Sequence, residues 1–562
     1  MAEQSLAITT SFAQQSLWLQ HQIDPGRSAY HVVAGVRLRG ALDVPALTAA
    51  LNAVAARHET LRTVFRLDAG VPVQVIGPVP PLTVPVVDVT AQEVDALVQR
   101  EIETPFDLAA GPLVRLRLLR LAADHHVAVL VMHHIITDGE STAILLRELL
   151  LHYAAEASGE PLELPELPIQ YADFAVWQRD LLGGARLDRL TDYWSGRLAG
   201  AAPLALPRPE DGAERGPSAG GLHEFTVPAS LRARLEAAAR DGDATLFMIL
   251  LAGFDALLGR WCGQEDVTVL SPVSGRSRPE LEEIIGYFVN PLLLRADLSG
   301  DPDARTVLAR VRETCLGAYD HEELPYEQAA NLIRGPGTER ERTADGRVMM
   351  VLQSPREENW SPAGLEWEQI PVGIGTAKAP LVLDLRPGSE VLHGVLEYDS
   401  GLFDAATVAA LGEDLLAAWE WLADLSSLPL SQVPGLKGPE EPARSAPEAS
   451  SPAPAAVSPQ AVAGAAAYVA PRTPLEEEVA LIWGELLGRE RVGVHDNFFD
   501  LGGQSLAAVR LTARLREEFG IGLAVRDLYA NFTVEEVAWR LLEALAAEQA
   551  DEADAGTGPA AV

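Results

Sequence analysis

The chain has 562 residues, of which 48% are hydrophobic and 22% charged, a composition typical of a globular protein with room for several domains. Its 44 basic and 80 acidic residues give a net charge of −36, which excludes the basic face that nucleic acids and anionic membranes require. The two cysteines, Cys262 and Cys315, lack metal-type spacing, and neither a signal-peptide pattern nor an apolar run of about 18 residues is present. We therefore expect a cytoplasmic protein without metal, disulfide or membrane span.

Residues 1–435 alternate between strand-like and helix-like stretches, which predicts an α/β region. Short apolar runs predict buried strands at 32–38, 127–132, 267–270, 348–352 and 381–385. Apolar residues at helical spacing predict helices at 46–58 and 142–153.

Residues 436–470 are rich in Ala, Pro, Ser and Glu and nearly lack large apolar side chains. Such a segment cannot bury enough surface to offset the entropy lost on ordering, so we expect a flexible linker. The acidic tail at 549–562, rich in small residues, is expected to be disordered.

A small all-helical domain is predicted at 471–548. Thr473 and Glu476 have the spacing of a capping box at the start of a helix, and Gly488 stands just past its end. The predicted helices are 473–488, 505–519 and 533–545.

The run VMHHIITDGES at 131–141 ends an apolar strand on two histidines and then turns. Adjacent residues at a strand end point to opposite faces, so only one of His133 and His134 can face a given cleft. Gly139 permits a tight turn, and Asp138 can bind backbone amides or an arginine and so fix the orientation of the histidine.

An earlier pair, His125-His126, is followed by VAVL with no Asp-Gly turn, so the informative pattern is HHxxxDG and not HH alone. Two plainer interpretations stay open at this point. Both histidines of the motif could be ordinary strand-end residues beside a turn, or they could bind zinc, although no motif supplies a third ligand.

Ser505 follows a Gly-Gly pair in DNFFDLGGQSL and opens a predicted helix. An N-cap role would account for it structurally. A nucleophile elbow would need glycine at Ala507, and a phosphate-binding P-loop would need Gly-Lys-Ser/Thr, so neither motif applies.

Residues 8–430 resemble the condensation domains of nonribosomal peptide synthetases, whose signature is HHxxxDG. Further stretches resemble motifs of that family and stand in its order along the chain. They are SFAQQSLW (11–18), RHETLRTVF (57–65), IQYADFAVWQ (169–178), IGYFVNPLLLR (285–295) and HEELPYEQ (321–328).

The resemblance implies an α/β fold of two chloramphenicol-acetyltransferase-like lobes arranged as a V-shaped pseudo-dimer. The first lobe is expected at 1–180 and the second at 181–435, with the active site in a tunnel between them. A small four-helix carrier domain on a flexible linker would follow.

The same resemblance implies which residues form the catalytic site. His134, the second histidine, would lie at the reaction centre, with His133 as its structural partner in the pair. Gly139 would lend its backbone N–H to the tunnel. Asp138 would be structural and paired with an arginine, for which Arg276 and Arg295 are the candidates.

Several positions depart from the family pattern. Ser16 stands where an arginine is usual, Glu140 replaces the tryptophan of DGWS, and Pro291 replaces a threonine. Ala379-Pro380 stands in place of the usual Phe-Asp. These departures leave the substrate preference open.

The stretch around Ser505 resembles the peptidyl carrier protein motif, in which this serine receives 4′-phosphopantetheine. The resemblance covers 473–547 and implies covalent attachment of that cofactor to Ser505 by a phosphopantetheinyl transferase. A hydroxyl on a small domain, carried by a Pro/Ala linker, could present a long thiol arm to distant sites.

Together the two resemblances imply an acyltransferase that forms C–N bonds. An acceptor α-amine on the arm of Ser505 would attack a donor acyl thioester on a partner carrier protein. The segment 436–470 is too short for an adenylation domain, so an adenylation enzyme would load Ser505 in trans, and we expect the chain to be a monomer. Three alternatives remain: an ester-forming or free-amine-accepting variant, an epimerase of the same superfamily, and a catalytically silent recruitment platform.

Overall fold

The structure is a computed structural model, and this description covers the residues whose placement it defines. They are 6–26, 28–78, 81–206, 220–333, 348–353, 364–370, 372, 377, 379–438, 468–498, 501, 511, 514–516, 518–520 and 533–543. Ser505, most of the predicted linker and the whole predicted tail lie outside them.

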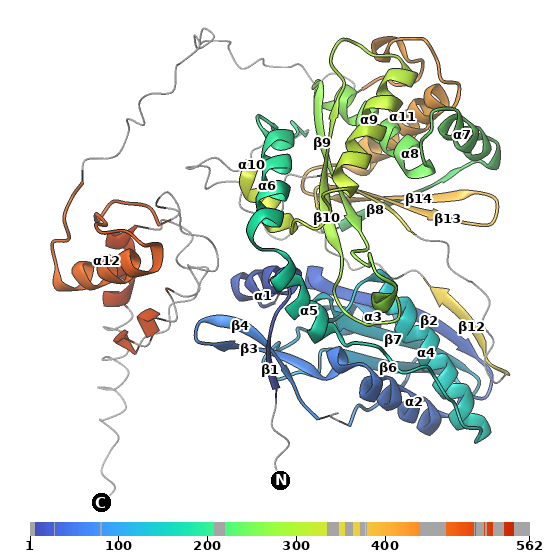
Figure 1. Ribbon diagram of the computed structural model, residues 1–562. Coiled ribbons are helices and arrows are strands. Elements are labelled where there is room, and N and C mark those ends of the chain that lie inside the picture. The colour runs from blue at the N-terminus through green and yellow to red at the C-terminus, as the bar shows by residue number, and fades with distance from the viewer. Residues whose placement is uncertain are drawn as a thin grey trace, which may run out of the picture.

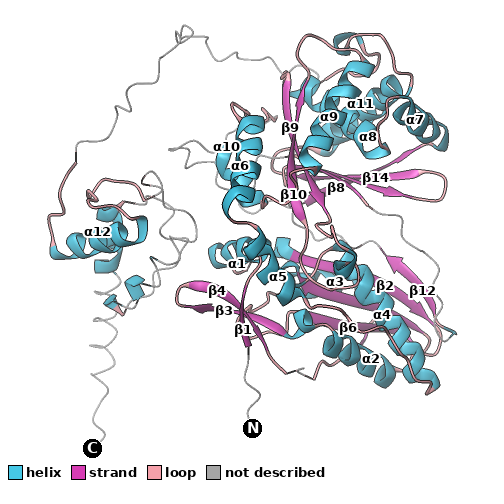
Figure 2. Ribbon diagram, in the orientation of Figure 1, coloured by secondary structure: helices cyan, strands magenta, loops and turns pink. Residues whose placement is uncertain are grey.

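The first half of the chain builds a five-stranded sheet in the order β12-β2-β7-β6-β5 and a three-stranded sheet in the order β1-β4-β3 (Figures 1 and 2). Its strands are β1 (Leu6–Thr9), β2 (His31–Arg39), β3 (Thr63–Asp68), β4 (Val71–Ile76), β5 (Val86–Asp88), β6 (Val114–Ala122) and β7 (His125–His133). Its helices are α1 (Phe12–Ile23), α2 (Val44–Arg57), α3 (Val94–Glu103), α4 (Gly139–Ser158) and α5 (Tyr171–Leu181).

Strand β7 lies at the centre of the larger sheet, paired antiparallel with β2 on one side and β6 on the other. Every residue of β7 after His125 is buried, which is why its sequence is a continuous apolar run and not an alternating one. Helices α2 and α4 pack against each other and contribute to the same core (Figure 1). The strands predicted at 32–38 and 127–132 and both predicted helices are confirmed.

The second half builds a six-stranded mixed sheet in the order β10-β9-β11-β13-β14-β8. Its strands are β8 (Gly220–Val227), β9 (Asp266–Val273), β10 (Asn290–Asp297), β11 (Met349–Leu352), β13 (Leu381–Pro387) and β14 (Leu392–Asp399). Its helices are α6 (Gly184–Leu198), whose buried residues lie in the core of this half, α7 (Ala229–Asp241), α8 (Leu246–Cys262), α9 (Ala304–Tyr319), α10 (Tyr326–Ile333) and α11 (Ala405–Ala423). The remaining three predicted strands are confirmed here, and a second large core forms around α8.

One strand crosses from the second half to the first. Strand β12 (Glu366–Ile370) pairs antiparallel with β2 and forms the edge of the five-stranded sheet. Gly35 of β2 permits this approach, because a Cβ there would lie 2.9 Å from the Ile370 side chain. The predicted division at residue 180 therefore omits a strand of the first sheet.

The two halves also meet through a small apolar cluster. Tyr171 and Phe174 of α5 pack with Leu281, Ile284 and Phe288 from the second half. Gly286 is required at this junction, since a Cβ there would lie 1.9 Å from the Tyr171 ring. The second half is thereby fixed against the first at the point where β7 ends.

The predicted linker is longer than the segment that the structure leaves undescribed. Leu436 is buried in the second core, and the Gly438 amide donates to the buried carboxylate of Asp414. At the other end, Tyr468 lies beneath the Arg491 guanidinium at 4.5 Å. Residues 436–438 therefore pack with the second half and residues 468–470 with the C-terminal body, which corrects the predicted linker bounds. The large side chains of Leu436 and Tyr468 could have suggested this.

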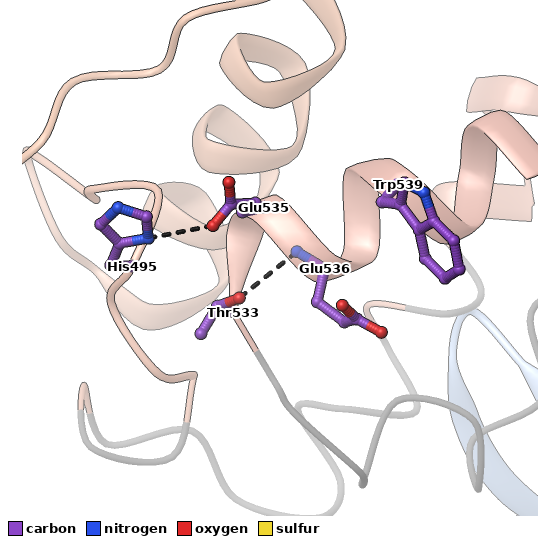
Figure 3. Close-up of a pocket in the computed structure, with 5 residues that line it drawn as sticks. All are labelled: His495, Thr533, Glu535, Glu536 and Trp539. Carbon is purple, nitrogen blue, oxygen red and sulfur yellow. Dashed lines mark hydrogen bonds and ion pairs between the residues drawn. The ribbon is translucent and has the colours of Figure 1, made fainter.

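The C-terminal body begins with α12 (Pro474–Leu487) and includes the helical residues 534–543. Its predicted capping box is confirmed, with the Thr473 hydroxyl accepting from the Glu476 amide, and Gly488 ends the helix at φ 63°. Trp483 packs edge-on against Phe498 in its core. Figure 3 shows the start of the last described helix, where the Glu536 amide donates to the Thr533 hydroxyl, and the helix predicted at 533–545 begins there.

Candidate active site

The histidine pair of the motif lies where β7 ends and a 3-10 turn, η3 (His134–Ile136), begins. His133 is the last residue of the strand and is buried, whereas His134 opens the turn and is partly exposed. The backbone leaves the strand between the two residues. The turn, and not strand alternation, therefore sends the two rings into different surroundings.

His133 is a structural residue. Its Nδ1 accepts a hydrogen bond from the Ile135 amide at 3.1 Å, and its ring lies among those of His21, His31 and Phe106. Burial, followed by the charges of His21 and His31, lowers the pKa of His133 well below its usual value. The ring is neutral, carries its proton on Nε2, and uses Nδ1 to hold the turn.

The orientation of His134 is set by its own turn. Its Nδ1 lies 2.7 Å from the Thr137 carbonyl oxygen, and a carbonyl can only accept, so Nδ1 carries the hydrogen and donates it. The neutral imidazole then has its lone pair on Nε2. The ring also packs edge-on against Tyr287 of the second half, with 4.8 Å between the centroids.

Asp138 caps α4 and connects it to the second half. Its Oδ1 accepts from the Ser141 amide at 2.7 Å, which is the usual N-cap geometry. Its Oδ2 accepts from the Phe288 amide at 3.0 Å, across the seam. The carboxylate is 1% exposed, so these hydrogen bonds and an ion pair replace the water it has lost.

Arg276 is the arginine that pairs with Asp138. Its Nη2 lies 3.2 Å from Asp138 Oδ1 and 2.7 Å from the Ser141 hydroxyl. Its Nη1 donates to the carbonyls of Leu281 and Ile284 at 2.6 and 2.9 Å. A guanidinium with four such contacts is held rigidly, and it fixes the Asp138 turn from the opposite half.

Arg295, the other candidate, does not reach Asp138. It forms a two-pronged pair with Asp266 on the neighbouring strand, Nε to Oδ1 at 2.7 Å and Nη2 to Oδ2 at 2.8 Å. The two residues lie on β10 and β9, which are adjacent in the six-stranded sheet. This pairing depends on strand register, which one sequence does not reveal.

Glu140, the residue that departs from DGWS, lies beside the same arginine. Its Oε2 is 3.0 Å from Arg276 Nε, although the N–H is not aligned for a hydrogen bond, so the contact is electrostatic. Partial burial raises the pKa of Glu140, and Arg276 opposes that rise. Asp138 and Glu140 thus share one guanidinium, and this trio carries a net negative charge when both carboxyls are ionised.

Gly139 opens α4 and is exposed. A Cβ built at this position would meet no atom within 4 Å. Its φ is not among the positive values that would require glycine, so neither the backbone nor the protein neighbours exclude a side chain. The use of its N–H in a tunnel stays a prediction.

Three residues of the site escaped the sequence analysis. The Tyr171 hydroxyl donates to the Tyr287 carbonyl at 2.5 Å and bonds the Ser11 hydroxyl at 2.9 Å. Ser141 bonds both the carbonyl and the amide of Gly286. Tyr171 and Tyr287 lie in motifs that were quoted, but only the folded chain brings them to the histidine turn.

The described residues hold no group of three or more His, Cys, Asp or Glu side chains placed to bind a metal ion. Within the same residues, no single helix is long and apolar enough to cross a membrane. The bent pair of α7 and α8 passes that test only together, by length and composition.

Comparison with known families decides the class of protein. The sequence model of the Condensation domain matches residues 4–440. The chain belongs to the condensation domain family. A second model, described as the phosphopantetheine attachment site, matches residues 477–541 and so includes Ser505. The serine hydroxyl is the group that can form the phosphodiester to that cofactor.

Relatives of this condensation domain occur in peptide synthetases. The chain is 38% identical over 444 residues to a linear gramicidin synthase of Brevibacillus parabrevis, a match that covers 76% of this chain but 8% of that protein. The chain therefore spans less than a tenth of the length of this relative. These matches confirm the resemblance to nonribosomal peptide synthetases.

Solved structures share the fold over the same region. The X-domain from teicoplanin biosynthesis, determined in complex with OxyB, has a TM-score of 0.69 at 28% identity and covers 77% of this chain and 97% of its own. The SgcC5 protein from Streptomyces globisporus has a TM-score of 0.61 at 28% identity and covers 75% and 100%. The predicted α/β fold is thereby confirmed for this chain, and the arrangement of its lobes as a V-shaped pseudo-dimer stays a prediction.

Proposed function

We propose that this chain joins a donor acyl group, held as a thioester on a partner carrier protein, to the α-amine of an acceptor on the phosphopantetheine arm of Ser505. The observation that carries the proposal is the His134 ring, which is partly exposed at the seam and oriented by the Thr137 carbonyl. The bound arm would supply a thiol that holds the acceptor and lets it reach the seam.

The chain's own residues orient the reacting amine and accept its proton. A free α-amine has a pKa of about 7.7–8.0, so at pH 7 about a sixth of it is already neutral and nucleophilic. His134 needs only to orient that amine and take a proton at Nε2 as the C–N bond forms. The negative trio of Asp138, Glu140 and Arg276 nearby would favour the resulting imidazolium.

Intact-protein mass spectrometry tests this function. The chain is converted to its phosphopantetheine form, loaded with an acceptor amino acid, and mixed with a donor carrier bearing an acyl group. We expect the mass of this chain to rise by that acyl group, and the Ser505→Ala variant to take up no phosphopantetheine. A Ser505→Ala variant that still acquires the arm would move the attachment site elsewhere.

The same experiment separates the alternatives. After the product is released from the arm, cleavage of its donor–acceptor bond by mild base indicates an ester, because an amide survives; deuterium exchange at Cα without transfer indicates an epimerase. Incubation of the phosphopantetheine form with ATP and amino acids alone should leave it unloaded, because loading is expected from an adenylation enzyme in trans. Self-loading would contradict that expectation.

A recruitment platform is the second candidate, favoured by the similarity to the X-domain that was solved with OxyB. In that case a loaded donor carrier would bind this chain without any change in mass. The oriented His134 favours catalysis, and transfer that survives His134→Ala unchanged would remove that argument.

A further inference from the structure

A carboxylate on α10 faces the seam from the second half. Glu327 lies in the first turn of that helix, and its Oε1 accepts a hydrogen bond from the Ser16 hydroxyl of α1 at 2.5 Å. Both side chains are partly exposed, so solvent and solutes reach them. The contact joins residues 311 positions apart and bridges the two halves.

This carboxylate, unlike three other carboxylates of the chain, has no cation among the described residues. Asp138 is paired with Arg276, Glu148 with Arg57, and Glu323 with Arg186. For Glu327, the part of the chain that the structure describes provides the Ser16 hydroxyl and no ion pair. A partly buried anion is stabilised by a cation far more than by one hydroxyl, so the site is incomplete in this chain alone.

Glu327 lies close to the reaction centre. Tyr287, which packs edge-on against the His134 ring, has its pKa raised by burial and then by the charges of Tyr30 and Glu327. Helix α1 also reaches the histidine turn, since Gln14 Nε2 donates to the Ile135 carbonyl at 3.3 Å. Glu327 thus contacts the same helix, α1, that contacts the histidine turn, and its charge is felt at Tyr287.

The sequence accounts for the missing cation. Ser16 stands at the position where the family usually has an arginine, and a serine side chain is several atoms shorter than an arginine. The substitution removes a guanidinium from the position opposite Glu327 and leaves less side chain there. A partly exposed carboxylate is left at the seam with a serine, and no arginine, opposite it.

We propose that Glu327 binds the cationic side chain of a carrier-bound basic amino acid, as in an ornithine-, lysine- or arginine-like residue, and so sets the substrate class of this condensation domain. The inference rests on the proposed function, which brings carrier-bound substrates to this seam. A side-chain ammonium suits the site better than the reacting α-amine, because its pKa is about 10.4 and it stays charged while the α-amine must become neutral.

Binding of small substrate mimics tests the site without turnover. The probes are amide analogues of the pantetheine thioesters of ornithine and of norleucine, with N–H in place of the sulfur. The two side chains match in length and differ by an ammonium in place of a methyl group. Isothermal titration of the full chain should show the ornithine probe binding at least about tenfold more tightly, which corresponds to about 1.4 kcal/mol.

Variants connect that preference to Glu327. Glu327→Gln keeps the size of the side chain and its bond to Ser16 but loses the charge, and should bring the two affinities to within about twofold. Ser16→Arg should abolish the preference by supplying the missing guanidinium. Glu323→Gln, on the same segment but already paired with Arg186, is the matched control and should keep the preference. Equal affinities in the unmodified chain, or a preference that survives Glu327→Gln, would overturn the proposal.

Turnover then identifies the carrier that presents the cation. Ornithine and norleucine are compared first on the donor carrier and then on Ser505, with amide formation followed by mass spectrometry. If ornithine is preferred only on the donor carrier, Glu327 binds the donor side chain; if it is preferred only on Ser505, Glu327 binds the acceptor side chain. If ornithine and norleucine form the amide at equal rates on both carriers, this inference is overturned and the proposed function stands. If the ornithine probe binds selectively but no amide forms, the proposed function is overturned and the binding site stands.

Discussion

One histidine pair begins strand β7 and a second spans the junction between its last residue and the turn that follows, and the two pairs have different surroundings. At the start, His126 is buried with an Nδ1 that has no hydrogen-bond partner among the described residues. At the end, His133 holds a turn and His134 is oriented by the Thr137 carbonyl. The residue pair is the same, so the difference comes from the turn that follows and from the half that packs on it.

The largest expected effect comes from comparing the same substitution at the two ends of β7. His134→Ala should lower amide formation by about 10²–10⁴-fold, because it removes the group that orients the amine and accepts its proton. His125→Ala, at the other end of β7, should change it by less than about twofold. The rates are measured by mass spectrometry, and thermal unfolding checks that both variants fold. Equal losses in the two variants would end the distinction between the strand ends.

The turn at the second end depends on the buried Asp138–Arg276 pair. Arg276→Ala leaves a carboxylate uncompensated in the interior and should reduce the free energy of unfolding by about 3–5 kcal/mol. Arg295→Ala breaks a partly exposed pair, worth about 0–1 kcal/mol, and two hydrogen bonds to the carbonyls of Arg197 and Ala199, and should cost less than Arg276→Ala because no buried charge is left without a partner. Urea unfolding of both variants measures the difference, and a larger loss for Arg295→Ala would contradict the assignment of Arg276.

The buried ring of His133 predicts a dependence of stability on pH. Its folded pKa lies well below the unfolded value of about 6.5, so the unfolded chain binds more protons there at acidic pH. The associated stability is present above pH 6.5 and is lost as the pH falls toward the folded pKa, by at most about 1.4 kcal/mol per pH unit.

His133→Asn should reduce that slope, because an amide oxygen can accept from the Ile135 amide without titrating. Urea unfolding between pH 5 and 8 measures both proteins. His21 and His31 also have a pKa lowered chiefly by burial, so part of the slope should remain in the variant. An unchanged slope would show that His133 is not the group that titrates.

The smallest expected effect on folding is that of Gly139→Ala. The new methyl group would meet no protein atom within 4 Å, so the free energy of unfolding should change by less than about 1 kcal/mol. A fall in amide formation greater than tenfold in this well-folded variant would show that substrate passes close to this position. A large loss of stability would contradict the open surroundings described here.

The sequence by itself determined the elements and the residue types of the site. The continuous apolar run of β7, the helices after it and the capping box at Thr473 could all be read from local patterns, because they depend on burial periodicity and on neighbouring residues. The HHxxxDG order also indicated which histidine pair mattered. The prediction that Ser505 carries the cofactor used a local pattern together with a family resemblance.

The tertiary structure alone decided which residues meet. Arg276 and not Arg295 pairs with Asp138, and β12 completes a sheet of the opposite half. From the second half, Tyr287 packs on His134 and Glu327 binds Ser16. These contacts join residues more than 130 positions apart. Contacts of that kind depend on strand register and on how two cores pack together, and no local pattern in the chain encodes either.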